Sequence, residues 1–417
     1  VSRGHRKTDL WDKEEYPEEF YVPNGNKIHL PYLASLIRLA DELDIAADRN
    51  LQFMYDAEKI DNEYSRLEFK KHQANRQLSI NEDSLIMIAD RSDESVYQSI
   101  LDLKEKLDQT FQECKKVVRE RTPYRITQRD ILIQPYNSFF LEEAEVKRLA
   151  IQGRLLSEYE QPVYQKIMNE RSGLTLLDVG CNNGWKTKMR FSNENFKKII
   201  GIDCLRPLIE QAQKELEDNV FSFYTCNVMD ADFTENLRQI MRQENLDTFD
   251  IIHCSFLLMH TERPDDILKN LRPFLARDGK LIVIEADDME SCMFPDSEGL
   301  FQKFLEILLN DPYAGKRTMG AELPQLLSDN GYTDIHCECS KVYSSGSEKE
   351  KKEQIFETFC SYLPEDLLLL RKQSKLYQRD WEWVNQNFNR LHEQMTDDES
   401  TISMGIKIYT CGGETYA

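Results

Sequence analysis

The sequence predicts an α/β protein whose larger part is built on a mostly parallel sheet, preceded by a mainly α-helical part. The first observation is a strand, glycine turn, helix and strand at 174–203. The second is the continued alternation of apolar strands with helical segments as far as residue 411, which favours a parallel sheet. The third is a helical spacing of apolar residues through much of residues 1–135. We therefore expect two domains, 1–135 and 136–417.

The stretch 174–203 carries the strongest signal. Its first strand is apolar and ends in a tight turn bounded by Gly180 and Gly184. Its second strand ends at Asp203, 19 residues after Gly184. That distance is close to the ~20 residues at which an acid reaches ribose hydroxyls. Since ligands bind beyond the carboxyl ends of parallel strands, the turn and Asp203 predict a site for a nucleoside-containing ligand.

The turn also resembles the first motif of the class I S-adenosylmethionine-dependent methyltransferases, acid-x-Gly-x-Gly-x-Gly. It matches at Asp178, Gly180 and Gly184, and Asn182 stands where the family has its middle glycine. Asn tolerates the left-handed conformation better than most residues. A dinucleotide oxidoreductase would need G-x-G-x-x-G, which is absent from the turn. On the turn alone, an ordinary strand and helix without a ligand stays open.

Later segments follow in the order that the family requires, which extends the resemblance over residues 140–415. The resemblance implies a Rossmann-like seven-stranded sheet, with its seventh strand antiparallel and at the edge. After 174–179 and 198–202, the expected strands are 221–226, 249–256, 281–285, 333–343 and 403–411. The insertion 344–401 is predicted to be a helical cap that forms either the substrate pocket or a dimer face.

The resemblance implies that the cofactor is S-adenosylmethionine and indicates which residues bind it. They lie in the turn and after the second, third and fourth strands: Asp178, Gly180, Cys181, Asn182, Gly184, Asp203, Cys204, Asn227, Val228 and Ser255. From the preceding helix, Gln152 and Arg154 are expected to reach the methionine carboxylate, because amide and guanidinium groups match a carboxylate. Surface positions on a packed helix are the alternative for these two residues.

Methyl transfer is an in-line displacement, so the protein mainly aligns the acceptor with the methyl carbon. We expect a small-molecule acceptor that is methylated at oxygen or nitrogen. A general base is needed only if the acceptor carries a proton of high pKa. His260, after the fourth strand, is the first candidate, since imidazole accepts a proton near neutral pH, and Glu285 and Asp287 are the others. A structural role for His260 stays open.

The N-terminal part has a different character. Residues 29–45 read as an amphipathic helix that resembles the closing segment of the HD superfamily of metal-dependent phosphohydrolases. The resemblance would make Asp41 the last metal ligand. The usual upstream His and His-Asp ligands are absent, so we predict no metal site, and Asp41 is alternatively a solvated helix carboxylate. A long helix at 92–121 follows.

This part suggests an alternative function, in which an HD-type phosphohydrolase remnant accompanies a methyltransferase-like domain that binds S-adenosylmethionine without catalysis, as a regulatory module. The N-terminal helices are then expected to contact a second copy of the chain or another domain. The sequence begins with Val, which suggests a fragment or a processed chain.

Charge and composition indicate which partners and which cellular compartment to expect. The formal net charge of −21 disfavours nucleic acid and anionic membrane surfaces. No apolar run approaches the ~18 residues of a membrane span. The ten scattered cysteines suggest reduced thiols, and we expect a cytoplasmic protein.

Overall fold

The chain forms two compact units in a computed structural model. Unit 1 comprises residues 1–145 and 370–376, and unit 2 comprises 146–369 and 377–417. The structure describes residues 8–23, 25–44, 62, 67, 70–71, 74–80, 84–89, 94–135, 143–168, 171–192, 195–230, 232–261 and 263–412. Each unit is described in turn.

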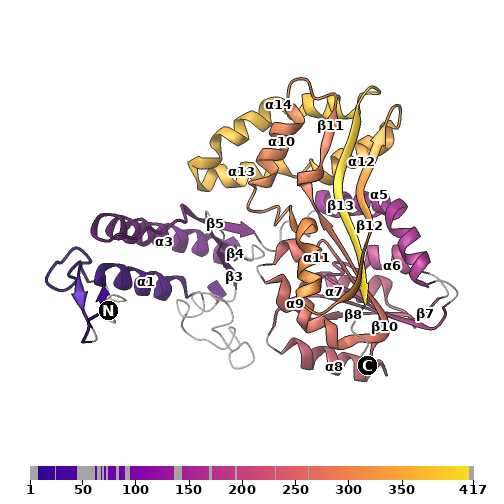
Figure 1. Ribbon diagram of the computed structural model, residues 1–417, viewed down its shortest axis with the longest axis horizontal. Helices are drawn as coiled ribbons and strands as arrows, with labels where there is room; N and C mark the ends of the chain where they lie inside the picture. The colour runs from indigo at the N-terminus through magenta and orange to yellow at the C-terminus, as the bar shows by residue number, and fades with distance from the viewer. Residues whose placement is uncertain are drawn as a thin grey trace. The chain divides into compact units, whose positions relative to one another are not determined.

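Unit 2 is built on a sheet that has eight strands among the described residues (Figure 1). Their order is β11, β13, β10, β9, β6, β7, β8, with β12 paired to β13. Five neighbouring strands are parallel, β6 to β10, and β13 runs antiparallel to β10, β11 and β12. The strands are β6 (Leu174–Val179), β7 (Phe196–Asp203), β8 (Phe221–Thr225), β9 (Phe249–Ser255), β10 (Leu275–Ala286), β11 (Cys292–Phe294), β12 (Thr333–Ser345) and β13 (Thr401–Gly412). All seven predicted strands are present, and β11 is an addition.

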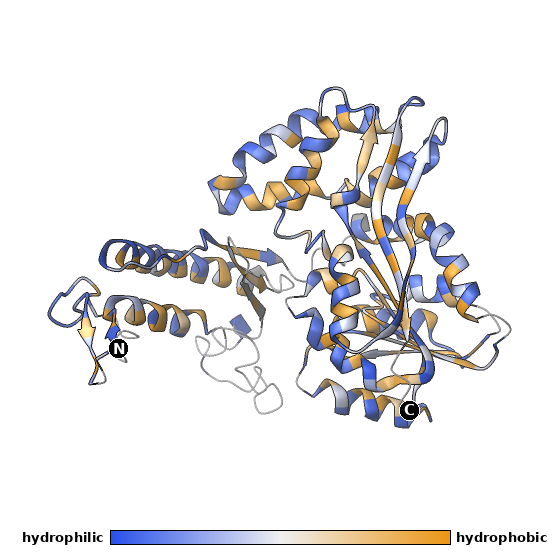
Figure 2. Ribbon diagram, in the orientation of Figure 1, coloured by the Kyte–Doolittle hydropathy of each residue, from blue (hydrophilic) through white to orange (hydrophobic). Residues whose placement is uncertain are grey.

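Helices precede, connect and follow the parallel strands, as the alternating sequence predicts. They are α5 (Glu143–Met168), α6 (Trp185–Phe191), α7 (Arg206–Leu216), α8 (Phe233–Gln243), α9 (Pro264–Leu271) and α11 (Met319–Asp329), with short 3₁₀ turns η4 (Leu258–His260), η5 (Arg272–Phe274) and η6 (Asp288–Glu290). Every residue of β6 is buried, as expected for a strand that is covered on both faces. Figure 2 shows this hydrophobic interior along the central strands.

The expectation of an edge position for the last strand is wrong. β13 lies between β10 and β12, and β12 is the strand at the side of the sheet. The segment from Ile402 to Ile408 is continuously buried, whereas most of β12 is exposed or half-buried. In the sequence, small and polar residues such as Ser403 and Gly405 alternate with apolar ones, which is the pattern of a half-exposed strand. In the structure these residues are buried as well, and β13 has a paired strand on each side.

The predicted cap is present between β12 and β13. The segment contains α12 (Lys349–Phe359), α13 (Leu363–Gln373), η7 (Lys375–Tyr377) and α14 (Gln378–Thr396), of which residues 370–376 are counted with unit 1. In unit 2, α10 (Leu300–Leu309) from earlier in the chain contacts α14. The Phe388 ring of α14 lies 5.0 Å from that of Phe356 and 6.4 Å from that of Phe304, between ring centroids. Aromatic packing therefore joins α10, α12 and α14.

Unit 1 contains helices and also a small sheet. Its elements are the hairpin β1 (Phe20–Tyr21) and β2 (Lys27–Ile28), α1 (Leu30–Leu43), β3 (Asn75–Ile80), β4 (Ser84–Ala89), α3 (Glu94–Arg121) and β5 (Asp130–Pro135). β4 is antiparallel to β3 and parallel to β5, and α3 connects the parallel pair. The apolar face of α3 packs in one core with α1 and the sheet. Both helices predicted in this part are present as α1 and α3, whereas β3 and β4 lie where no strand was predicted.

Candidate functional site

The strand order of unit 2 locates the candidate site. β6 lies between β7 and β9, so the connections from β6 and from β9 lead toward opposite ends of the sheet. Such a switch point opens a crevice beyond the carboxyl ends of the strands, where ligands bind in folds of this type. The turn after β6 and the segment after β9 therefore frame the site.

The turn after β6 has the conformation that its residues suggest. Gly180, Asn182 and Gly184 have φ values of 76°, 54° and 73°, all left-handed. The amides of Gly180 and Cys181 donate to the carbonyl of Ile202, at distances of 2.8 and 3.0 Å, so the turn is attached to the end of β7. Asn182 thus takes the place of the family's middle glycine, as the sequence analysis predicts.

Asp203 joins this turn to the end of β7. Its Oδ2 accepts a hydrogen bond from the amide of Asn182, and its Oδ1 accepts one from the amide of Leu205, both at 2.9 Å. Burial raises the pKa of the Asp203 carboxyl, and these backbone donors oppose the shift. Each carboxylate oxygen can accept more than one hydrogen bond, so Asp203 retains acceptor capacity for ribose hydroxyls. Cys204, the next residue, is exposed.

Asp178, the acid of the motif, is engaged within the protein. Its Oδ1 lies 2.7 Å from Nδ1 of His253, and its Oδ2 accepts a hydrogen bond from the hydroxyl of Thr187. The other His253 nitrogen lies 3.0 Å from the hydroxyl of Tyr164, and all four side chains are buried. Burial alone would raise the pKa of Asp178, but the adjacent His253 and Arg190 hold it below its usual value. This network fixes α5, α6, β6 and β9 to one another behind the turn.

The remaining predicted cofactor residues differ in exposure. Cys181 and Val228 are buried. The amide of Asn227 donates to Asp230, and its oxygen accepts from the backbone of Met229 at 3.1 Å. Ser255, at the end of β9, accepts a hydrogen bond of 3.2 Å from Arg190. Asn227 and Ser255 thus lie beyond the ends of β8 and β9 in defined orientations.

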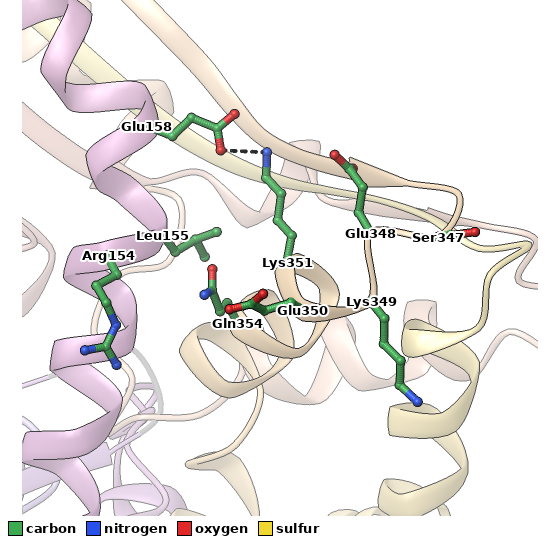
Figure 3. Close-up of a pocket in the computed structure, with 9 residues that line it drawn as sticks. All are labelled: Arg154, Leu155, Glu158, Ser347, Glu348, Lys349, Glu350, Lys351 and Gln354. Atoms are coloured by element: carbon green, nitrogen blue, oxygen red, sulfur yellow. Dashed lines mark ion pairs between the residues drawn. The ribbon is translucent and has the colours of Figure 1, made fainter.

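Gln152 and Arg154 have different surroundings on α5. Gln152 is buried, and its oxygen accepts a hydrogen bond of 3.1 Å from Nζ of Lys186 in the first turn of α6. Residues two apart on a helix do not share a face, and Arg154 is exposed. Figure 3 shows Arg154 with Glu158 and residues of α12 around a cavity of about 440 Å³. Turn residues and Asp203 are not among the residues that line this cavity. The structure therefore brings Gln152 together with Lys186.

Sequence analysis missed Lys186, although it directly follows the turn. Burial lowers its pKa to about 7, and the charge of Arg190 acts in the same direction. Lys186 therefore offers, beside the start of α6, a half-buried amine that is only partly protonated at neutral pH, and a bound carboxylate would favour its protonated form. Its place two residues after Gly184 is the only sequence signal for this role.

His260 lies in η4, directly after β9. Glu285 fixes this segment, because its carboxyl oxygens accept hydrogen bonds from the amides of Leu257 (3.1 Å), Leu258 (2.6 Å) and Met259 (3.4 Å). Burial raises the pKa of Glu285 to about 8. Glu285 thus positions the segment that carries His260. Asp287 is buried and lies 3.6 Å from Lys407.

His260 is exposed, at the last position of η4. The loop before α11 lies against it, since a side chain at Gly315 would collide with Nδ1 of His260 at 2.8 Å. Desolvation, Arg317 and Arg148 all lower its pKa, to about 4. The imidazole is therefore neutral at pH 7.

The HD-like residue of unit 1 lies on an exposed helix surface. Asp41 is exposed near the end of α1. Within the described ranges, no group of three or more His, Cys, Asp or Glu side chains is arranged to hold a metal ion. In the same ranges, no helix combines the length and apolar character needed to span a membrane.

Comparison with known proteins gives a family match in each part of the chain. Residues 1–115 match the family model HD-CE, and residues 170–359 match a family model described as a methyltransferase domain. These matches confirm both resemblances drawn from the sequence.

A curated relative is the malonyl-[acyl-carrier protein] O-methyltransferase of Halalkalibacterium halodurans. It is 24% identical over 107 residues, which is 26% of this chain and 37% of the relative. The chain therefore spans little more than a third of that protein's length.

Solved structures with similarity include a putative methyltransferase from Bacillus halodurans C-125 and phosphoethanolamine N-methyltransferase 2 of Haemonchus contortus. The first is 13% identical with a TM-score of 0.38, and the match covers 61% of this chain and 99% of that one. The second is 12% identical with a TM-score of 0.36, covering 66% of this chain and 59% of the other, and was solved in complex with S-adenosyl-L-methionine.

Proposed function

We propose that the chain is an S-adenosylmethionine-dependent methyltransferase that acts on oxygen or nitrogen of a small molecule. The observation that carries the proposal is the connection between the left-handed turn 180–184 and Asp203, at the ends of two adjacent parallel strands. Backbone that approaches a ligand closely and an acid for ribose hydroxyls are what a nucleoside-containing cofactor requires. The methyltransferase family match over 170–359 supports the same function.

In this proposal, different residues bind different parts of the cofactor. Asp203 accepts hydrogen bonds from the ribose, and Asn227 and Val228 contact the adenine. Gln152 and Lys186 bind the methionine carboxylate, Lys186 as the cation and Gln152 through its amide. Asp178 does not contact the cofactor in this proposal. Its hydrogen bonds to His253 and Thr187 hold the strands and the helix that carry the turn.

The bound cofactor would supply an electrophilic methyl group on a sulfonium. The protein's own contribution is to hold the acceptor in line with that carbon. His260 is neutral at neutral pH and exposed on the acceptor side, so its free nitrogen can take the acceptor's proton. Its low pKa makes it a weak base, which suits an acceptor whose proton becomes acidic as the new bond forms.

We place the protein in the cytoplasm. No disulfide joins any of the ten cysteines, all of which lie in the described ranges, and six of them are buried. Reduced thiols of this kind are typical of cytosolic proteins.

Calorimetric titration tests the proposal directly. The purified chain is titrated with S-adenosylmethionine, with S-adenosylhomocysteine, and with NAD as the control. We expect both sulfur compounds to bind and NAD not to bind. Binding without turnover across an acceptor screen would favour the regulatory alternative, and absence of binding would refute the proposal.

A further inference from the structure

A group of buried polar atoms lies in the loop before α11 and in the cap, outside the cofactor residues. Arg317 donates from Nε to Asp288 at 2.7 Å, but its Nη2 is buried and has no hydrogen-bond partner among the described residues. The same is true of the hydroxyls of Tyr362 and Thr358 in the cap. Buried polar groups without partners are rare in native proteins and indicate a ligand or ordered water. All three of these groups can donate a hydrogen bond.

Arg148 of α5 connects these groups. Its Nη1 donates to the carbonyl of Thr358 at 2.8 Å, and its guanidinium carbon lies 5.3 Å from the centre of the Tyr362 ring. The charges of Arg317 and Arg148 both oppose the rise that burial causes in the pKa of Tyr362. Arg148 therefore contacts the Tyr362 ring and the backbone of Thr358, and the charge of Arg317 also acts on Tyr362.

Charged side chains of both signs act on this group of atoms, in a chain whose formal net charge is −21. Two cations, Arg317 and Arg148, lower the pKa of His260. Asp288 offsets Arg317 through their ion pair. Burial raises the pKa of Asp311 to about 6, so this carboxyl is mostly ionised at neutral pH. The ligand argument therefore rests on the buried donors of Arg317 and Tyr362 that have no partner among the described residues, which favour a ligand with oxygen acceptors.

We propose that the methyl acceptor carries an oxyanion, a carboxylate or a phosphate group, that Arg148, Arg317 and Tyr362 bind between the cap and the loop before α11. Guanidinium groups match both anions through paired hydrogen bonds, and the tyrosine hydroxyl supplies a third donor. This inference rests on the proposed function, since it names the acceptor class of the same enzyme. It also gives the cap a role in specificity.

The test uses the full chain saturated with S-adenosylhomocysteine. Sodium phosphate and sodium acetate are titrated separately by calorimetry at constant ionic strength. We expect at least one of them to bind, and the preferred anion identifies the acceptor as a phosphate or as a carboxylate. Absence of binding by both anions would overturn the inference.

Variants separate this site from general charge effects. Arg148→Gln and Tyr362→Phe should each weaken anion binding, the first at least tenfold, and Arg148→Lys should recover part of the loss. Lys147→Gln is the matched control, because it removes one exposed cation from the same turn of α5 and should change the affinity less than twofold. Equal losses in Arg148→Gln and Lys147→Gln would refute the specific site.

The affinity for S-adenosylhomocysteine is measured first for every variant. Unchanged cofactor affinity together with weakened anion binding supports both proposals. Cofactor binding by the parent chain without anion binding overturns only the acceptor class. Anion binding that depends on Arg148 in a chain that does not bind the cofactor refutes the methyltransferase proposal and leaves the oxyanion site in place.

Discussion

Gly184 is the position in the turn where a side chain has the least room. A Cβ atom there would lie 2.5 Å from Cε1 and 2.7 Å from Cζ of Phe223. The ring has little freedom to move, because it is fully buried and also lies 2.7 Å from a Cβ position at Gly201. Gly184→Ala therefore combines a left-handed backbone penalty of ~1–2 kcal/mol with an overpacking cost of ~1–3 kcal/mol. We expect the free energy of unfolding to fall by about 2–5 kcal/mol.

Gly173→Ala is the control that separates the two costs. Gly173 has a φ of 70°, nearly that of Gly184, and a Cβ atom would meet nothing within 4 Å. Its cost should be the backbone penalty alone, ~1–2 kcal/mol. The effect of Ala on the unfolded chain is the same at both positions and cancels in the difference. Urea unfolding of both variants measures this difference, and Gly184→Ala proving no more costly than Gly173→Ala would refute the packing argument.

Three further predictions concern the site. Asp203→Ala should weaken S-adenosylmethionine binding by tenfold or more while the far-UV circular dichroism stays the same, because it removes acceptors for the ribose, and unchanged affinity would exclude the ribose role. His260→Ala should lower turnover more than cofactor affinity. In the parent enzyme the rate should rise with pH through about 4 and level off above it, as the imidazole loses its proton, and a variant as fast as the parent would leave His260 a packing role. Asp178→Asn should destabilise the fold by about 3–5 kcal/mol, because it leaves a buried network without its charge. Since the folded pKa of Asp178 is lowered, its contribution is present above pH ~4 and is lost as the pH falls through the folded pKa, so the stability gap between parent and variant should narrow in acid.

The strand pattern and the turn were predictable because both depend on local rules. An apolar run ended by Gly180 defines β6, a second one that ends at Asp203 defines β7, and the spacing between the two follows from one helical crossover. Asn182 could be placed in the left-handed region because few other residues accept that conformation. The edge assignment of β13 failed because a strand's neighbours are set by the order of the whole sheet.

Partners of the site residues were less predictable than the residues themselves. Asp178 matches the motif, but its engagement with His253 arises from pairing of β6 with β9, 75 positions later in the chain. Gln152 and Arg154 look equivalent in sequence, and only the packing of α5 against α6 separates them. A motif therefore predicted which residues matter at the site more reliably than what each one binds.

The acceptor side shows the limit of sequence analysis most clearly. Arg148, Arg317 and Tyr362 come from α5, from the loop before α11 and from the cap, and no spacing rule relates such distant positions. Arg317 and Tyr362 share an energetic property instead. Each has a buried polar atom without a hydrogen-bond partner among the described residues, and such an atom destabilises the fold unless a ligand or water satisfies it. If the Tyr362 hydroxyl serves ligand binding at the expense of stability, Tyr362→Phe should stabilise the free chain slightly and should weaken the oxyanion complex. A gain in melting temperature together with a loss in anion affinity would identify a residue kept for its ligand.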